Sequence, residues 1–339
     1  MFRPGKRNLI TDVAGLTVGH AQDAAARTGV TVLMTDRRYP CAADMRGGAP
    51  GNTNVEALDP VNLVDGIDAI ALSGGSAFGL DAVSGVMAHL RAQGRGFEIA
   101  PGAPKVPIAA GAILFDLANG GDKDWGEAPF YRALAIAACE SAAGDFALGN
   151  AGAGLGAVAG AYKGGTGSAS AVTDDGFTVG ALAVVNAVGS PLIPGTDVFW
   201  AFALERGGEF GGRRLKGPLP EIDSEIPRDA KGARANANTT IAIVATDADL
   251  TRVELKRLAI MAADGFARSL RPVHAPFDGD TVFALSTGRK PIAEFRALEV
   301  TRLGSLAADT IARAIARGVY EAETLGNVKS YREIFANGE

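Results

Sequence analysis

The sequence is poor in the two side chains that most often build metal sites and disulfides. Cys41 and Cys139 are the only cysteines, and His20, His89 and His274 are the only histidines. Two distant cysteines in a chain of 339 residues predict reduced, buried thiols. An HExxH motif, a CxxC pair and any cluster of His with Cys are all missing, which argues against a zinc site.

Long runs of one kind of residue are missing as well. The formal net charge is -5 and no long run of Lys or Arg occurs, which argues against nucleic-acid binding. No stretch of about 18 apolar residues occurs, so we expect no membrane span. The basic N-terminal stretch is not followed by an apolar one, which argues against a secretory signal. We therefore expect a cytoplasmic protein.

Aromatic residues are sparse at 6%, whereas 47% of the chain is hydrophobic and 45 residues are glycine. The core must therefore consist mainly of Ala, Val, Leu and Ile, whose small side chains let sheets and helices pack closely in layers. A capping box at Thr251 and Glu254 predicts the start of one helix. A length of 339 residues usually suggests two domains, but a single large α/β layered domain over 1–339 also fits it. Apolar periodicity predicts further helices at 79–90, 128–142 and 305–320 and strands at 13–20, 29–35, 68–72, 178–188, 239–250 and 281–287.

Two familiar catalytic and nucleotide-binding motifs are also missing. The chain has no GxSxG, which argues against an α/β-hydrolase, and no GxxxxGK[ST] phosphate loop. The stretch GAGLGAVAG at 152–160 does not match GxGxxG, because Ala159 stands where the third glycine belongs. These glycines allow either close packing of layers or an anion-cradling turn, and we favour packing.

The stretch from about 204 to 238 differs from the rest of the chain. It combines prolines, glycines and mixed charges without an apolar period, which predicts an exposed loop. It runs directly into the β-branched strand that begins TTIAIV at Thr239. A self-cleaving precursor needs an accessible bond ahead of a rigid strand, although many ordinary proteins also join a loop to a strand in this way.

A hydrolase without a catalytic histidine or a metal needs another base. A threonine at a chain N-terminus supplies one, because its α-amino group has a pKa of about 7.7–8.0 and sits beside its own hydroxyl. Attack of the Thr239 hydroxyl on the Asn238 carbonyl would expose such a terminus through an ester. Asp278 and Asp280 precede the next predicted strand and point the same way, so both are candidates to serve that site. The alternative is a turn with solvated acids, and we favour a structural role for His274.

At these residues the sequence resembles the L-aminopeptidase/D-esterase family, which includes the β-aminopeptidases and the 6-aminohexanoate-oligomer (nylon-oligomer) hydrolases. The resemblance covers nearly the whole chain. It is carried by NLITDVAGLTVGHAQD, DMRGGAPGN, LSGGSAFGLDAVSGV, AGAGLGAVAG, KGGTGSAS, LAVVNAVG, NTTIAIVATDA and DGDTVFAL. It implies a four-layer αββα sandwich (α+β), shared with the ornithine acetyltransferases, and autocleavage into a large and a small chain.

The family's functional residues map onto positions of this sequence. The cut falls between Asn238 and Thr239, which gives chains 1–238 and 239–339 and makes Thr239 the nucleophile. Asp278 and Asp280 match the paired acids of the nylon-oligomer branch. Asn186 matches an asparagine that stabilises the oxyanion, and Lys163 is the candidate for a nearby lysine. The resemblance implies no metal and no organic cofactor, and a homo-oligomer of four processed units.

The sequence also departs from the family pattern. The aminopeptidases use Ser as nucleophile with Ser and Glu downstream, whereas this chain has Thr and two Asp, which favours the nylon-oligomer branch. Phe115 stands where some relatives carry tyrosine. We therefore predict an amide hydrolase for small amine-bearing peptides, β-peptides, amino-acid amides or 6-aminohexanoate oligomers. An acyltransferase on the same fold and an uncleaved, non-enzymatic ligand-binding protein are the alternatives.

Overall fold

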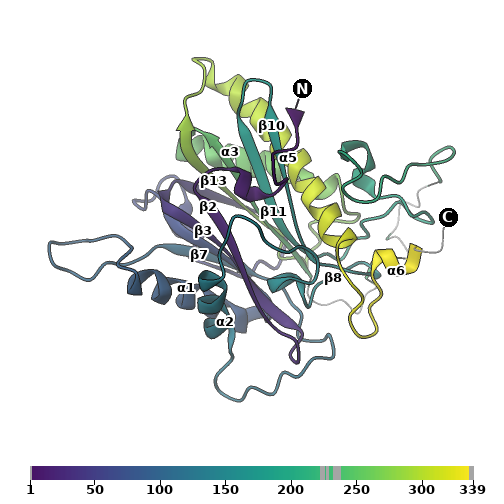
Figure 1. Cartoon of the computed structure of the whole chain (residues 1–339), viewed down its shortest axis with the longest axis horizontal. Helices are drawn as coiled ribbons and strands as arrows, with labels where there is room; N and C mark the ends of the chain where they lie inside the picture. The colour runs from purple at the N-terminus through teal and green to yellow at the C-terminus, as the bar shows by residue number, and fades with distance from the viewer. Residues whose placement is uncertain (1, 222–225, 227–228, 232–237, 336–339) are drawn as a thin grey trace.

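A computed structural model describes the chain except for residues 1, 222–225, 227–228, 232–237 and 336–339. Two β-sheets lie face to face, and helices cover the outer face of each sheet (Figure 1). Three apolar clusters fill the two helix–sheet boundaries and the boundary between the sheets. This arrangement confirms the predicted four-layer αββα sandwich.

The larger sheet has six strands and carries the strand that begins at Thr239. Its order is β1-β10-β11-β12-β13-β4, and every neighbouring pair is antiparallel except the parallel pair β12 and β13. All residues of β11 and β12 are buried, as expected for strands covered on both faces. The strands are β1 (Phe2–Arg3), β10 (Thr166–Thr173), β11 (Thr178–Asn186), β12 (Thr239–Ala248), β13 (Thr281–Lys290) and β4 (Cys41–Met45).

The smaller sheet has five strands in the order β2-β3-β6-β7-β5. The antiparallel pair β2 and β3 confirms the predicted hairpin, and β6 and β7 are parallel. Its strands are β2 (Leu16–Asp23), β3 (Thr28–Tyr39), β6 (Ile67–Ser73), β7 (Ala109–Ile113) and β5 (Asn52–Thr53). A separate short pair, β8 (Val158–Ala159) and β9 (Tyr162–Lys163), follows the glycine-rich stretch.

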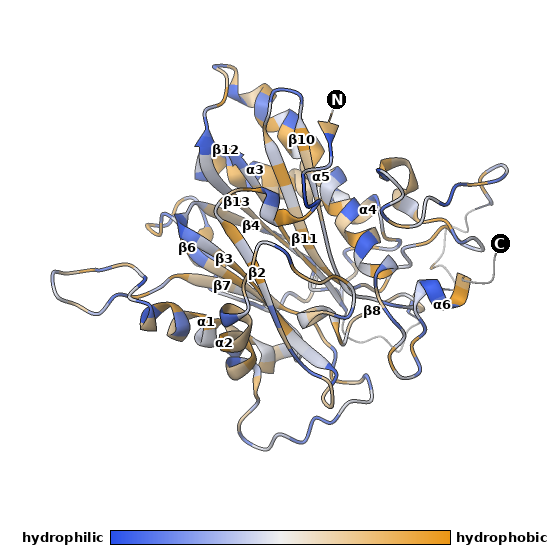
Figure 2. Cartoon of the chain, viewed as in Figure 1, coloured by the Kyte–Doolittle hydropathy of each residue, from blue (hydrophilic) through white to orange (hydrophobic). Residues whose placement is uncertain are grey.

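The helices cover the sheets in pairs. Helices α1 (Asp81–Ala92) and α2 (Tyr131–Glu140) pack on the smaller sheet, and α3 (Arg252–Ala262) and α5 (Arg296–Tyr320) on the larger one. In Figure 2, α5 alternates hydrophilic and hydrophobic residues, as expected of a helix lying on a sheet. The short elements are α4 (Asp264–Ala267), α6 (Tyr331–Phe335) and the 3-10 turns η1 (Ile10–Asp12), η2 (Glu56–Leu58), η3 (Ser76–Leu80), η4 (Gly152–Gly154) and η5 (Trp200–Leu204).

Most predicted elements are present, with shifted ends. The capping box is confirmed, since the Thr251 side chain accepts from the backbone N–H of Glu254 and Glu254 accepts from the N–H of Thr251 at 2.8 Å. Helix α5 begins nine residues earlier than predicted, because Val300 and Leu303 continue its buried face toward the N-terminus. Both cysteines are free and buried, as predicted.

The stretch predicted as an exposed loop is only partly exposed. Its described residues from 205 to 238 form no helix or strand, as expected. However, Glu205 and Phe210 are buried. Glu205 accepts hydrogen bonds from the backbone N–H groups of Phe210 at 2.9 Å and Gly212 at 2.8 Å. These backbone donors therefore have partners although the segment has no regular secondary structure.

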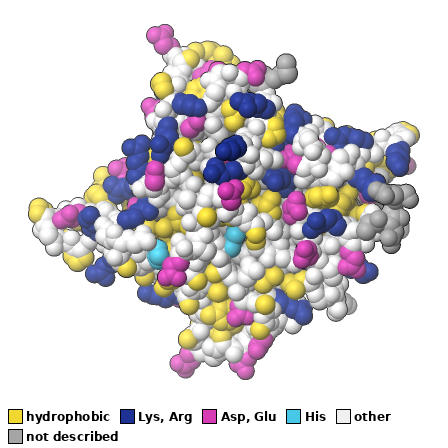
Figure 3. All heavy atoms as spheres, viewed as in Figure 1, with side chains coloured by type: hydrophobic (Ala, Val, Ile, Leu, Met, Phe, Trp, Pro, Cys, Tyr) yellow, Lys and Arg dark blue, Asp and Glu magenta, His cyan; other side chains and the backbone are white. Residues whose placement is uncertain are grey.

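Charged residues of both signs are interspersed on the molecular face in Figure 3.

Glycines set the close approach of α5 to β10. A Cβ atom at Gly167 would lie 1.9 Å from the carbonyl oxygen of Ala314 and 2.4 Å from the backbone nitrogen of Gly318. No real Cβ makes such contacts with backbone atoms, so α5 would have to move away from the sheet. The small residues at this boundary are therefore required by packing.

We expect Gly167→Ala to destabilise the protein by about 1–3 kcal/mol, because overpacking displaces α5. Thermal or urea unfolding measures this loss. Gly217→Ala is the matched control, since a Cβ there meets no atom within 4 Å. Equal stability of the two variants would contradict the packing described here.

Candidate active site

Thr239 is the first residue of β12 and is 4% exposed. In the antiparallel pair it lies opposite Asn186, the last residue of β11. On its other side the parallel strand β13 begins at Thr281, and an isolated bridge pairs Asn238 with Asp278. The ends of three neighbouring strands therefore meet at Thr239, although these residues are far apart in the sequence.

The Asn238–Thr239 peptide lies against its own potential nucleophile. The Thr239 hydroxyl donates a hydrogen bond to the carbonyl oxygen of Asn238. The backbone N–H of Gly279 donates to the same carbonyl oxygen at 2.9 Å and to the Thr239 hydroxyl oxygen at 3.2 Å. A buried donor on a carbonyl oxygen stabilises negative charge that develops there during attack. A hydroxyl, a carbonyl and an oxyanion donor are thus assembled around one peptide bond.

The two predicted acids lie in different environments. Asp280 accepts from the backbone N–H of Thr240 at 2.7 Å through one oxygen, and from the backbone N–H and Nδ1 of His274 at 3.1 and 2.8 Å through the other. Asp278 accepts from the backbone N–H of Ala275 at 2.8 Å through Oδ2. Its Oδ1 is buried and has no hydrogen-bond partner among the described residues. Asp278 therefore has an oxygen available for a cation.

Burial raises the pKa of the Asp278 carboxyl to about 6, and the charge of Asp280 acts in the same direction. The neighbouring Lys231 and His274 partly oppose this shift. At neutral pH the carboxyl is therefore ionised, although burial makes the ionised form unfavourable in free energy. A positive charge beside Oδ1 would stabilise it.

The side-chain amide of Asn186 is hydrogen-bonded to two backbone groups. Its Nδ2 donates to the carbonyl oxygen of Phe115 at 3.1 Å, and its Oδ1 accepts from the backbone N–H of Val158 at 3.0 Å. Phe115 therefore takes part through its backbone. The oxyanion role of Asn186 stays a prediction, whereas the N–H of Gly279 contacts the Asn238 carbonyl oxygen.

Lys163 lies on the glycine-rich side of the site and is 1% exposed. Its amino group donates to the carbonyl oxygens of Gly154 at 2.9 Å and Gly164 at 2.6 Å. Burial lowers its pKa to about 7, and the charge of Asp116 opposes this shift. The structure thus brings Lys163 close to the site but gives it no hydrogen bond to Thr239 or to the two predicted acids within the described chain.

The glycine-rich stretch itself serves packing, as predicted. A Cβ at Gly154 would lie 2.2 Å from the backbone nitrogen of Thr166, and one at Gly156 would lie 2.4 Å from the carbonyl oxygen of Arg27. The backbone therefore approaches neighbouring segments as closely as glycine permits.

Two groups of the candidate site, a lysine side chain and a backbone N–H, were not predicted from the sequence. The amino group of Lys231 donates to Asn238 Oδ1 at 2.7 Å and to Asn186 Oδ1 at 3.1 Å. The backbone N–H of Gly279 contacts the Asn238 carbonyl oxygen. Lys231 belongs to a stretch whose composition predicted only an exposed loop, and no signal in the sequence places it beside β11. Gly279 stood between the two predicted acids, and its N–H follows from the same bridge that positions Asp278.

The motif DMRGGAPGN encloses the loop that carries the acids. The backbone N–H groups of Arg46 and Ala49 donate to the carbonyl oxygens of Asp280 at 2.9 Å and Asp278 at 2.8 Å. A Cβ at Gly47 would lie 2.1 Å from the carbonyl oxygen of Asp278. This glycine therefore lets the two segments touch through their backbones.

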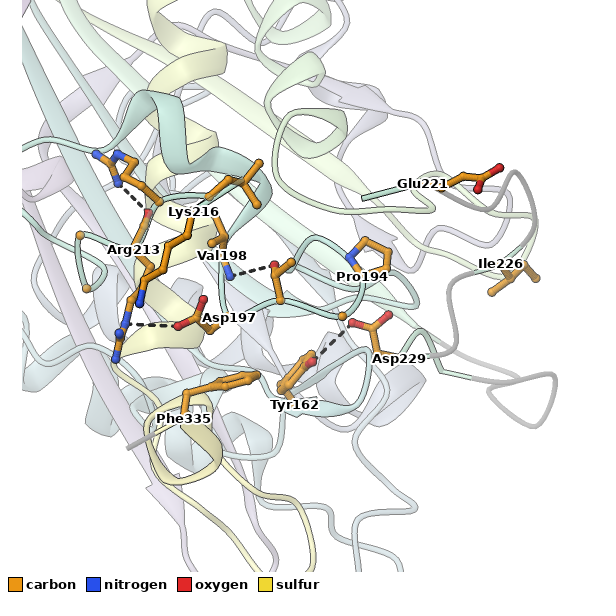
Figure 4. Close-up of a pocket in the computed structure, with 16 residues that line it drawn as sticks. Tyr162, Pro194, Asp197, Val198, Arg213, Lys216, Glu221, Ile226, Asp229 and Phe335 are labelled. Carbon is orange, nitrogen blue, oxygen red and sulfur yellow. Dashed lines mark hydrogen bonds and ion pairs between the residues drawn. The ribbon is translucent and has the colours of Figure 1, made fainter. Parts of the chain in front are cut away.

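One cavity of the protein is lined by residues other than those of the candidate site. It has a volume of about 1150 Å³ and is formed mainly by residues 194–198 and 211–216, with Tyr162, Asp229 and Phe335 (Figure 4). Tyr162 precedes Lys163 in β9, and Asp229 lies two positions before Lys231.

Across the described ranges, no cluster of three His, Cys, Asp or Glu side chains is arranged to hold a metal ion. No helix among them is both long and apolar enough to cross a membrane.

The αββα sandwich and this site define an α+β hydrolase of peptide or amide bonds. The chain belongs to Peptidase family S58, whose family model matches residues 8–332. It is 41% identical to an uncharacterized aminopeptidase of Mycobacterium tuberculosis over 97% of this chain and 98% of that protein. It is 30% identical to a 6-aminohexanoate-oligomer endohydrolase of Kocuria sp. over 84% and 76% of the two chains. The predicted family resemblance is therefore confirmed.

Solved structures agree on the fold. A β-aminopeptidase from Burkholderia sp. superposes with a TM-score of 0.67 at 24% identity, covering 98% of this chain and 90% of that one. The L-aminopeptidase D-Ala-esterase/amidase from Ochrobactrum anthropi, described as a variant of the Ntn hydrolase fold, gives a TM-score of 0.69 at 18% identity over 98% and 94%.

The buried carboxyl of Asp278 makes a prediction about stability. Its pKa lies above the ordinary value of 3.8, so the ionised form destabilises the fold above pH 6, and this penalty disappears as the pH falls toward 4. In a Thr239→Ala background we expect Asp278→Asn to stabilise the chain by about 1–3 kcal/mol at pH 8 and by much less at pH 4.

Thermal unfolding at the two pH values measures this difference. Asp280→Asn is the matched control, and it should destabilise the chain at pH 8 because both Asp280 oxygens already accept hydrogen bonds. A destabilising effect of Asp278→Asn at pH 8 would contradict the environment assigned to Asp278.

Proposed function

We propose that the chain is a self-processing amidohydrolase that cuts its own Asn238–Thr239 bond and then uses Thr239 as an N-terminal nucleophile. The observation that carries this proposal is the contact of the Thr239 hydroxyl with the carbonyl of the preceding residue, with the N–H of Gly279 at 2.9 Å from that carbonyl oxygen. Membership of a peptidase family supports it.

The self-cleavage is an acyl shift followed by hydrolysis. The Thr239 oxygen attacks the carbonyl carbon of Asn238, the hydroxyl proton passes to the Thr239 nitrogen, and the C–N bond breaks to give an ester. Water then cleaves the ester, which restores the hydroxyl and leaves a carboxylate on Asn238 and a free amine on Thr239.

The two products are expected to stay together as one domain. Strand β11 lies in 1–238 and β12 in 239–339, yet the two strands pair from Thr239 to Thr246 of β12. The cluster between the sheets also contains residues of both parts, among them Leu182 and Ile243. Separating the parts would expose this apolar surface to water, which is unfavourable.

In turnover the new α-amino group takes the hydroxyl proton as the Thr239 oxygen attacks a substrate amide. Near pH 7 a useful fraction of this amine is neutral. The acyl-enzyme then forms on Thr239 and water releases it. Asp278 Oδ1 is the carboxylate oxygen best placed to attract an ammonium, since both oxygens of Asp280 are already engaged.

The substrates we propose are small amine-bearing amides: short peptides, β-peptides, amino-acid amides or 6-aminohexanoate oligomers. The names of the relatives, an aminopeptidase and a 6-aminohexanoate-oligomer endohydrolase, support this range. Release of a primary amine from a panel of these compounds distinguishes among them. A cytoplasmic location and assembly of four processed units stay predictions from the sequence.

Intact-mass measurement of the purified protein, with N-terminal sequencing of the smaller product, tests the proposal. We expect a fragment that begins TTIAIVATD, absent in Thr239→Ala and present in Thr239→Ser, because serine keeps the hydroxyl. Amide hydrolysis should appear only in the cleaved proteins.

Other outcomes separate the alternatives. Cleavage of Thr239→Ala between residues 238 and 239 would exclude Thr239 as the nucleophile. A wild-type chain that stays intact and hydrolyses no amide would favour the ligand-binding protein. Transfer of the acyl group to an added amine in preference to water would favour the acyltransferase.

A further inference from the structure

The amino group of Lys231 lies among three oxygen atoms beside the proposed scissile bond. It donates to Asn238 Oδ1 at 2.7 Å, to Asn186 Oδ1 at 3.1 Å and to the Asn186 carbonyl oxygen at 3.2 Å. A lysine ammonium carries three N–H donors and no acceptor. The three acceptors therefore match the charged form of this side chain and leave none of its protons unused.

The first of these bonds fixes the residue whose carbonyl is attacked. Lys231 and Asn238 are seven positions apart, and their side chains are hydrogen-bonded. The backbone is held at both ends, since the N–H of Lys231 donates to the Val188 carbonyl at 2.9 Å and that of Asn238 to the Phe277 carbonyl at 3.3 Å. Restricting the acyl side of the bond lowers the entropy cost of bringing the carbonyl carbon to the Thr239 oxygen.

The other two bonds fix Asn186, which pairs with Thr239 across the sheet. Together with the N–H of Val158, Lys231 occupies the Oδ1 side of the amide, so Nδ2 points to the Phe115 carbonyl. One ammonium therefore sets the position of both side chains that flank the Thr239 backbone.

The charged groups around Lys231 differ in sign. Desolvation, with a smaller effect of the Lys163 charge in the same direction, lowers the pKa of the Lys231 amino group to about 7. Asp278 opposes both effects, and it is itself influenced by Asp280 and His274. The ammonium is therefore favoured below neutral pH and is lost as the pH rises through 7.

We infer that Lys231 is a positioning residue for self-cleavage, which holds Asn238 and Asn186 in place while Thr239 attacks. This inference rests on the proposed self-processing. Lys231 transfers no proton in this scheme and acts through the two asparagines that it contacts.

A pulse–chase in cell-free translation, followed by mass spectrometry of intact and cut chains, measures the processing rate. We expect Lys231→Met to process at least about tenfold more slowly, the effect of losing one charged hydrogen bond in the transition state. Lys231→Arg keeps a charged donor and should recover part of the rate. Lys105→Met, which removes an exposed lysine, is the matched control and should process like the wild type.

The outcomes separate this inference from the proposed function. Cleavage of Thr239→Ala would overturn the self-processing itself. If Thr239→Ala stays intact and Lys231→Met processes within about twofold of the wild type, only the role of Lys231 is overturned.

A melting temperature of Lys231→Met below that of Thr239→Ala would show that the variant folds poorly, and its slow processing would then have a second explanation. In that case the pH dependence of the processing rate decides. The wild-type processing rate should then fall as the pH rises above 7. In Lys231→Arg this fall should be absent, because a guanidinium stays charged. Identical profiles of the two proteins would overturn the inference.

Discussion

The register of β12 in the larger sheet is the constraint on which the site depends. Antiparallel pairing with β11 sets Thr239 opposite Asn186, and parallel pairing with β13 sets it beside the loop of Asp278 and Gly279. A shift by one residue would turn every side chain of β12 to the opposite face. Because β12 is buried on both faces between two apolar clusters, such a shift is strongly disfavoured.

The same burial explains the electrostatics of the site. Carboxylates and amino groups removed from water lose hydration, so the pKa of Asp278 rises to about 6 and the pKa values of Lys163 and Lys231 fall to about 7. All three groups therefore titrate near neutral pH. The layered fold thus places a carboxyl group and two amino groups with shifted pKa values near Thr239, and His274 contacts the other acid, Asp280. This result refines the structural role expected for His274.

Much of the fold could be predicted, because apolar periodicity reports which faces are buried. The hairpin of β2 and β3, the continuous apolar run of β11 and the capping box at Thr251 are examples. The start of α5 was placed too late, since Glu299 and its neighbours look exposed in the sequence but belong to a buried helix face. In the site, the sequence predicted that Asp278 and Asp280 lie close together. Their different hydrogen bonds could not be predicted, because those of Asp280 depend on where His274 and Thr240 lie.

The sequence by itself determined the layered architecture, the family, and a hydroxyl residue at the start of a core strand, because those properties reside in local pattern and residue type. Only the tertiary structure decided which groups meet at Thr239. Lys231 lies 45 residues from Asn186, and their contact arises from the path of the chain around β11. Likewise the N–H of Gly279 reaches the Asn238 carbonyl only because β12 and β13 run in parallel. Contacts between distant segments follow from sheet register and layer packing, which no local sequence pattern encodes.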